Sequence, residues 1–275
     1  MSTPFLKKRI NLGTTTNLKK TFKKNKLHTV CESAKCPNIS ECFDRKVATF
    51  LILGDICTRF CSFCGIEKGK PFSLDKKEPK RIAENIQKLK ISYAVITSVT
   101  RDDLKDGGAK HFVNTVSEVR KLCPETKIEI LVPDFSGKKE SFDIIFSCRP
   151  DILSHNVETV PRLYSKVRRG ADYKRSLELL TAAGDSGLKT KSGIMLGLGE
   201  KEEEIFNVMD DLIKARCKIL TLGQYLSPSK AHYDVYEYVS EESFNQLKEI
   251  ALNKGFEYCA SGPYVRSSYL AESMI

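Results

Sequence analysis

Six of the ten cysteines fall into two closely spaced triplets. The first triplet has the spacing CxxxxCxxxxxC and consists of Cys31, Cys36 and Cys42. The second has the spacing CxxxCxxC and consists of Cys57, Cys61 and Cys64. A triplet cannot pair fully within itself as disulfides, whereas closely spaced soft thiolates are ligands for zinc or for iron–sulfur clusters. The two triplets therefore predict metal binding.

Two kinds of metal site are open for these thiols. A zinc site could consist of three cysteines and a fourth ligand. The CxxC at Cys61 to Cys64 would suit such a site, and His28 could be the fourth ligand of the first triplet. A four-iron cluster on three thiolates instead leaves one iron without a protein ligand, and that iron can bind a substrate. No histidine lies near the second triplet, and zinc cannot transfer an electron. We therefore favour iron–sulfur clusters.

The chain must position these thiols on a regular scaffold. Apolar runs that suit buried strands recur at residues 47–53, 93–99, 128–132, 152–154, 192–196 and 219–222. Helical periodicity lies between them, most clearly at residues 201–216. Repeated strand–helix units predict parallel strands joined by right-handed crossovers. We expect an α/β fold, a partial (β/α)6 barrel of the TIM type with N-terminal and C-terminal extensions.

The predicted strands divide the chain into three parts. Residues 1–45 form an N-terminal extension with the first triplet, residues 46–257 form the barrel, and residues 258–275 form a tail. Cys57 follows the first strand, at the strand ends where such barrels keep their active sites. Other polar residues follow later strands in the same way: Thr97, Ser98, Asp134, His155, Asn156, Glu158, Glu200, Gln224 and Tyr225.

Charge and hydropathy indicate which partners and which cellular compartment to expect. The formal net charge of +10 favours an acidic protein, an anionic cofactor or nucleic acid as partner. No stretch approaches the roughly 20 apolar residues that cross a bilayer, so we expect no membrane association. The first 26 residues lack the apolar run of a secretory signal. We therefore expect a reducing compartment, the cytoplasm.

The CxxxCxxC segment after the first strand resembles the cluster signature of the radical S-adenosylmethionine superfamily. The first triplet and the segment Arg266-Ser-Ser-Tyr269 narrow the resemblance to the lipoyl synthase family. The likeness continues through residues 96–104, 131–135, 155–158, 222–226 and 229–232. It spans about residues 27 to 272, nearly the whole chain.

The resemblance implies two [4Fe–4S] clusters and S-adenosylmethionine as cofactors. The cluster on Cys57, Cys61 and Cys64 is expected to bind and reduce S-adenosylmethionine, and the resulting radicals remove hydrogen at C6 and C8 of a protein-bound octanoyl chain. An auxiliary cluster, held by Cys31, Cys36, Cys42 and Ser268, is expected to be consumed as the sulfur source. From their position after the fourth predicted strand, we expect Asn156 and Glu158 on the ribose of S-adenosylmethionine and Arg168 on its carboxylate.

The resemblance also implies partners. The substrate is expected to be an octanoylated carrier protein, either a lipoyl domain of a 2-oxoacid dehydrogenase or the glycine cleavage H protein. A ferredoxin or flavodoxin is expected to supply electrons, and an iron–sulfur carrier protein to rebuild the auxiliary cluster. Neither nucleic acid nor a membrane is expected as a partner.

Two other functions share part of this pattern. Another sulfur-inserting member of the superfamily, such as biotin synthase or a methylthiotransferase, shares the second triplet but is disfavoured by the first triplet's spacing and by the near-terminal serine. A zinc-stabilised nucleic-acid-binding protein would fit the +10 charge and the grouped cysteines. That class is disfavoured because neither a recognition motif nor an aromatic stacking platform is evident.

Overall fold

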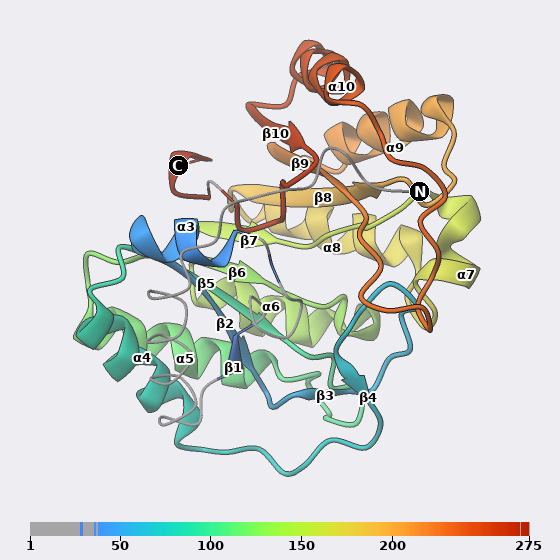
Figure 1. Ribbon diagram of the computed structural model, residues 1–275. Helices are drawn as coiled ribbons and strands as arrows, with labels where there is room; N and C mark the ends of the chain where they lie inside the picture. Colours follow the sequence, from blue (N-terminus) through green and yellow to red (C-terminus); the bar gives the residue numbers. More distant parts are fainter. Residues whose placement is uncertain (1–27, 30–35, 37, 270, 275) are drawn as a thin grey trace.

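The main sheet consists of parallel strands with one antiparallel addition at its edge (Figure 1). The computed structural model describes residues 28–29, 36, 38–269 and 271–274. The strand order is β1-β2-β5-β6-β7-β8-β9-β10, and every neighbouring pair from β2 to β10 is parallel, whereas β1 pairs antiparallel with β2. The bounds are β1 His28–Thr29, β2 Val47–Ile52, β5 Tyr93–Ser98, β6 Lys127–Leu131, β7 Ile152–Ser154, β8 Thr190–Leu196, β9 Ile219–Gln224 and β10 Tyr258–Gly262.

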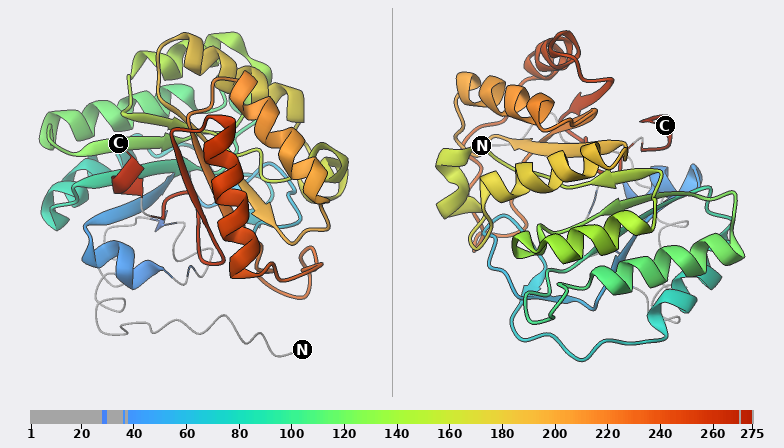
Figure 2. Two further views of the ribbon diagram at one scale, coloured as in Figure 1. Left: turned by 90° about the horizontal axis from the view of Figure 1, so that it is seen from above. Right: turned by 180° about the vertical axis from the view of Figure 1, so that it is seen from behind.

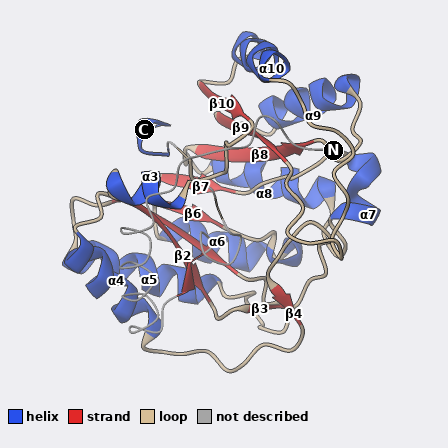
Figure 3. Ribbon diagram, viewed as in Figure 1, coloured by secondary structure: helices blue, strands red, loops and turns tan. Residues whose placement is uncertain are grey.

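Long helices connect successive parallel strands and lie on the outer face of the sheet (Figures 2 and 3). They are α4 Glu78–Leu89, α5 Ala109–Leu122, α6 Lys139–Ser147, α8 Tyr173–Asp185, α9 Glu202–Lys214 and α10 Glu241–Lys254. Within the described chain, no helix has the length and apolar content that a membrane span requires. The one-helix-per-strand alternation is the arrangement of a partial (β/α)6 barrel, and the expected fold class is confirmed.

The hydrophobic core lies between the sheet and its helices because alternate strand residues point outward. Phe50 of β2, Ile96 of β5 and Ile130 of β6 belong to one buried cluster, which α4 and α5 cover. A second cluster contains Leu220 of β9 with the apolar stripe of α9. That stripe is buried at Ile205, Val208, Met209 and Leu212, as the periodicity of residues 201–216 predicts.

The six predicted strands correspond to β2 and to β5 through β9. The pairings of β1 with β2, of β10 with β9 and of β3 with β4 were not predicted. Strand β10 continues the sheet beside β9 with the sequence YCASG. Its small residues have low β-propensity, so the sequence predicts them as part of the C-terminal tail. Cys57 belongs to a two-residue strand, β3 (Ile56–Cys57), which pairs with β4 (Glu67–Lys68).

The inner face of the barrel is lined by polar and apolar side chains of alternate strand residues. On this face, Lys191 Nζ of β8 lies 2.9 Å from Glu129 Oε2 of β6, and both side chains are fully buried. Tyr93 of β5 donates its hydroxyl to the same carboxylate oxygen over 2.9 Å. The C-terminal tail covers this face beside Tyr93, since Ala271 packs with Val47 and Tyr93.

Candidate active site

The second cysteine triplet lies on a loop whose two sides are held by backbone hydrogen bonds. At its base Gly69 donates its backbone N–H to the carbonyl of Cys57 over 3.0 Å. At its far side Ser62 N–H donates to the carbonyl of Val167 over 2.9 Å, and Tyr233 N–H donates to the carbonyl of Ser62 over 2.9 Å. The loop is therefore fixed between the C-terminal end of α7 (Tyr164–Val167) and the chain that follows β9.

The three thiols of this loop are partly buried and lie close enough for their charges to influence one another. Burial raises the pKa of Cys61 to about 12, and the neighbouring Cys64 and Cys57 thiols contribute because their negative charges would repel. Cys57 Sγ accepts backbone N–H groups from Thr100 at 3.3 Å and from Arg59 at 3.5 Å. Sulfur atoms that accept amide hydrogen bonds are typical ligands of iron–sulfur clusters.

This donor set fits a cluster better than a single zinc ion. Among the residues that the structure describes, no three or more His, Cys, Asp or Glu side chains are arranged to hold one metal ion. The thiolates of a four-iron cluster bind different iron atoms, so they need not converge on one point. Cys57, Cys61 and Cys64 are partly exposed, which leaves an approach for a second ligand of the open iron.

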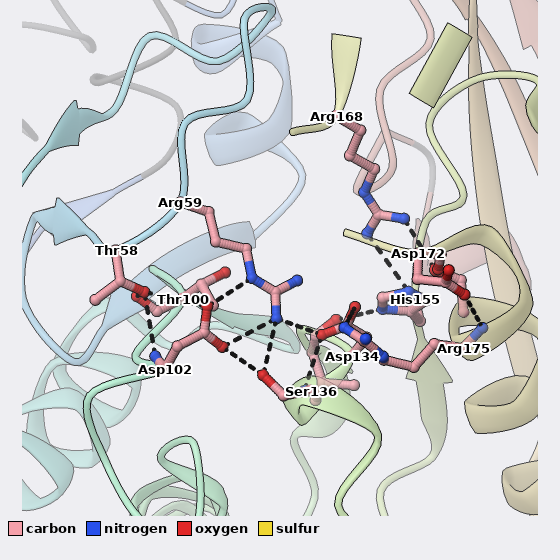
Figure 4. Close-up of polar contacts among 12 residues, drawn as sticks. Thr58, Arg59, Thr100, Asp102, Asp134, Ser136, His155, Arg168, Asp172 and Arg175 are labelled. Atoms are coloured by element: carbon pink, nitrogen blue, oxygen red, sulfur yellow. Dashed lines mark hydrogen bonds and ion pairs between the residues drawn. The ribbon is translucent and has the colours of Figure 1, made fainter. Parts of the chain in front are cut away.

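Polar side chains from neighbouring strand ends meet beside the loop (Figure 4). His155, directly after β7, is buried; its Nδ1 donates to the carbonyl of Val132 over 2.8 Å and its Nε2 faces Arg168 Nη2 at 3.4 Å. Burial and the Arg168 cation lower the pKa of His155 to about 3. Arg168 Nη1 donates to the hydroxyls of Tyr164 and Ser176, each over 3.0 Å. A neutral His155 thus fixes a buried arginine near Cys61.

Asn156 joins the strand ends to the C-terminal tail. Its Nδ2 donates to Ser267 Oγ over 2.7 Å and to Glu158 Oε1 over 3.2 Å. Its Oδ1 is buried and has no hydrogen-bond partner within the described part of the chain. Burial raises the pKa of Glu158, and the nearby Arg168 opposes that rise. A buried amide oxygen without a partner, beside a carboxylate and an arginine, fits a polar ligand such as S-adenosylmethionine.

Glycines of β8 and the following turn allow neighbouring side chains to approach the backbone closely. A Cβ at Gly193 would lie 2.6 Å from Thr221 Oγ1 and 2.9 Å from Asn156 Oδ1. Gly197 has a φ of +91°, and its N–H donates to Glu200 Oε1 over 2.6 Å. Glu200 therefore closes the turn that follows β8.

Two of the three cysteines of the first triplet lie within the described residues. Cys42 is buried in α3 (Ile39–Asp44), and Cys36 precedes this helix. Burial raises the pKa of Cys42 to about 11, and the charge of the neighbouring Cys36 contributes. Cys31 lies outside the described residues. Ser268 is partly buried in the tail after β10.

Helix α3 and the tail contact each other directly. Tyr269 donates its hydroxyl to Glu41 Oε1 over 3.0 Å, and the guanidinium of Arg45 lies 5.4 Å from the Tyr269 ring centroid. Arg45 Nε also pairs with Glu272 Oε1 at 3.0 Å. Asn38 donates to the carbonyl of Tyr264 over 2.7 Å. These contacts bring the segment of Cys42 beside the segment of Ser268.

The structure brings the predicted residues into two groups. In the first group, Cys57, Cys61 and Cys64 share one loop, with Arg168 and Glu158 beside it. In the second group, Cys42 lies in α3 and Cys36 just before it, next to the C-terminal tail that contains Ser268. Sequence reasoning missed Arg59, which is buried and paired with two carboxylates. The sequence does contain a signal for Arg59: acidic residues follow neighbouring strands, and carboxylates buried together need a nearby cation.

Comparisons with known proteins agree on one family. The model of the radical SAM superfamily matches residues 51–212, more than half of the chain. A lipoyl synthase of Caldicellulosiruptor saccharolyticus is 56% identical over 255 residues, which are 92% of this chain and 90% of that protein. A lipoyl synthase of Geotalea daltonii is 52% identical over 270 residues, which are 98% of this chain and 92% of that protein.

Solved structures at low sequence identity share the fold. Streptococcus suis SuiB bound to the precursor peptide SuiA has a TM-score of 0.61 at 14% identity, over 95% of this chain and 57% of that one. Methylornithine synthase, PylB, has a TM-score of 0.56 at 15% identity, over 78% of this chain and 71% of that one. At such identities the likeness concerns the barrel alone.

Proposed function

The chain belongs to the lipoyl synthase family of the radical SAM superfamily, and from this membership we propose how its residues insert two sulfur atoms into a protein-bound octanoyl group. One observation carries the assignment of residues. A loop with three neighbouring thiols lies at the strand ends, and contacts between α3 and the tail hold two cysteines of a second set beside the segment that contains Ser268. A single metal centre would not require this second assembly.

We assign Cys57, Cys61 and Cys64 to the cluster that binds S-adenosylmethionine, and Cys31, Cys36, Cys42 and Ser268 to the auxiliary cluster. When bound, the first cluster supplies the electron that cleaves S-adenosylmethionine and the second supplies the sulfur. The chain's own part is to hold the reacting groups together and to exclude water. We propose that the N-terminal extension (residues 1–45) and the tail (residues 258–275) complete the active site of the barrel (residues 46–257). The first five residues of the tail form β10.

Asn156, Glu158 and Arg168 are assigned to S-adenosylmethionine. The unpartnered Oδ1 of Asn156 and the carboxylate of Glu158 are acceptors for ribose hydroxyls. Arg168 suits the carboxylate because a buried guanidinium forms bidentate pairs with carboxylates. His155 holds Arg168 in place without adding charge, since its lowered pKa of about 3 keeps the imidazole neutral near pH 7.

The substrate is an octanoylated lipoyl-carrier protein, a lipoyl domain or the glycine cleavage H protein. We further propose a ferredoxin or flavodoxin as the electron donor, an iron–sulfur carrier protein for rebuilding the auxiliary cluster, and the cytoplasm as the location. None of the nine described cysteines forms a disulfide, and thiols suit a reducing compartment.

Metal analysis tests the two-cluster assignment. Anaerobically purified protein is expected to hold roughly eight irons with matching sulfide. Replacing Cys57, Cys61 and Cys64 together by alanine should leave about four irons, and so should replacing Cys31, Cys36 and Cys42. Wild-type protein with only one cluster, or with zinc in place of iron, would refute the assignment.

The role of Ser268 is tested by its variants. An oxygen ligand holds iron less firmly than thiolates do, so it suits an iron that must leave when the auxiliary cluster opens. Ser268→Cys is therefore expected to keep about eight irons and to cleave S-adenosylmethionine, but to form little lipoyl product, measured by mass spectrometry of an octanoylated peptide. Sulfur insertion by Ser268→Cys at the wild-type rate would contradict this role.

A further inference from the structure

The loop between Cys57 and Cys61 contains one buried charged residue. Arg59 is 7% exposed, whereas the next residue, Phe60, is 58% exposed. Burial of a guanidinium is unfavourable unless its donors are paired. The loop therefore contains a feature that the assigned thiols do not explain.

Two carboxylates from neighbouring strand ends pair with this guanidinium (Figure 4). Arg59 Nε and Nη2 donate to the two carboxylate oxygens of Asp102, after β5, over 2.8 and 2.9 Å. Nη2 also donates to Asp134 Oδ1, after β6, over 2.5 Å. A bidentate pair fixes both the distance and the plane of the guanidinium. Arg59 thus joins the cysteine loop to two strand ends.

The turn after β6, which presents Asp134, is itself strained. Phe135 and Ser136, directly after Asp134, have φ angles of +46° and +55°, in the left-handed region that disfavours residues other than glycine. Ser136 donates its N–H to Asp134 Oδ1 over 3.0 Å and its hydroxyl to Asp102 Oδ1 over 2.8 Å. Such conformations persist only where surrounding contacts impose them, and they concentrate at functional sites.

The same network reaches the sulfur of Cys57. Thr58 donates its N–H and its hydroxyl to the carbonyl of Thr100, over 3.1 and 3.0 Å, and Asp102 N–H donates to the Thr58 hydroxyl over 3.1 Å. Thr100 in turn donates its N–H to Cys57 Sγ. Hydrogen bonds to a ligating sulfur favour the reduced, more negative state of a cluster. The position of Thr100 relative to Cys57 therefore bears on electron transfer.

We propose that Arg59 is a positioning residue: its pairing with Asp102 and Asp134 holds the Cys57 sulfur against the Thr100 N–H and thereby sets the reduction potential of the cluster on this loop. The inference rests on the proposed cluster at Cys57, Cys61 and Cys64. The fork geometry of Arg59, and not its charge alone, performs this role. Lysine at this position keeps the charge but cannot pair with both carboxylates in one plane.

The test compares Arg59→Gln, Arg59→Lys and Asp134→Asn with the wild type. Each is made in protein whose auxiliary cysteines Cys31, Cys36 and Cys42 are replaced by alanine, so that one cluster is observed. A redox titration followed by electron paramagnetic resonance is expected to give a more negative midpoint potential for all three variants. Arg120→Gln is the matched control, because Arg120 pairs with Asp151 away from this loop and its loss should leave the potential unchanged.

A second measurement needs no cluster. In metal-free protein, hydrogen–deuterium exchange at the amides of Thr58 and Thr100 is expected to be at least about tenfold faster in Arg59→Gln than in the wild type, because lost contacts lower the local opening free energy. Exchange in the core strand β8 should be unchanged, which separates a local effect from unfolding. If Arg59→Gln does not fold, Asp134→Asn answers the same question with a smaller change.

Three outcomes would overturn the proposal. They are a wild-type potential in both Arg59 variants, full rescue of the potential by Arg59→Lys, and an equal shift in Arg120→Gln. Failure of the proposed function is distinguishable, because the parent protein with its auxiliary cysteines removed would then hold no iron at this loop.

Discussion

At the scale of single residues, His155 serves the site as a neutral group. Its Nδ1 donates to the carbonyl of Val132 over 2.8 Å, so its Nε2 is left as an acceptor toward Arg168. A protonated ring would place a second cation against that guanidinium in a fully buried position. Burial and Arg168 both hold the pKa of His155 down, at about 3.

This lowered pKa predicts a pH dependence of stability. The unfolded chain binds a proton at His155 near its ordinary pKa of 6.5, whereas the folded chain does so only near 3. Stability from this residue is therefore present above pH 6.5 and is lost as the pH falls toward 3. Between pH 7 and 5 the loss is about 2 kcal/mol. Denaturant unfolding of the wild type and of His155→Gln should show the two unfolding free energies converging by that amount; parallel curves would contradict the prediction.

At the scale of secondary-structure elements, the barrel strands could be predicted from apolar runs, and the site only in part. Cysteine spacing identified the second triplet because its ligands are close in sequence. The pairing of Arg59 with Asp102 and Asp134 joins residues far apart in the chain, and only the parallel order of β2, β5 and β6 brings them together. Strand β10 escaped prediction because its hydrogen bonds to β9, and not its small side chains, define it.

The close approach of β8 to Asn156 gives a prediction for one glycine. Gly193→Ala places a Cβ 2.6 Å from Thr221 Oγ1 and 2.9 Å from Asn156 Oδ1, so the amide must move. We expect the dissociation constant for S-adenosylmethionine to rise by about tenfold or more, equivalent to about 1.4 kcal/mol, measured by isothermal titration calorimetry on cluster-loaded protein.

Gly262→Ala provides the matched control for this change. Gly262 also lies in a strand of the main sheet, β10, but its Cβ would meet Val265 Cγ2 at 3.6 Å, an ordinary contact. Affinity for S-adenosylmethionine should therefore stay near that of the wild type. Equal weakening by the two alanines would mean that a loss of strand flexibility, and not displacement of Asn156, explains the effect.

At the scale of the whole molecule, exposed cations lie beside the loop that contains Cys57, Cys61 and Cys64. Ser62 of the loop donates its hydroxyl to the carbonyl of Lys166 over 2.8 Å, and Gly170 lies against Arg59. The side chains of Lys166 and Arg169 are exposed there, as is the ring of Phe60. A carrier protein must bring its octanoyl group to this region, so the electrostatic field of these cations acts on the carrier as it approaches.

An acidic carrier protein is therefore expected to depend on these charges for docking. In Lys166→Glu/Arg169→Glu, the KM for an octanoylated carrier domain should rise about tenfold at low ionic strength, and the difference should shrink as salt screens the charges. A short octanoylated peptide without acidic residues should react equally with both proteins. The control Lys88→Glu/Lys121→Glu makes the same change of net charge at the far ends of α4 and α5, where both lysines are exposed. If that control raises the KM equally, net charge alone guides the carrier; if neither variant changes it, the carrier docks without using this surface.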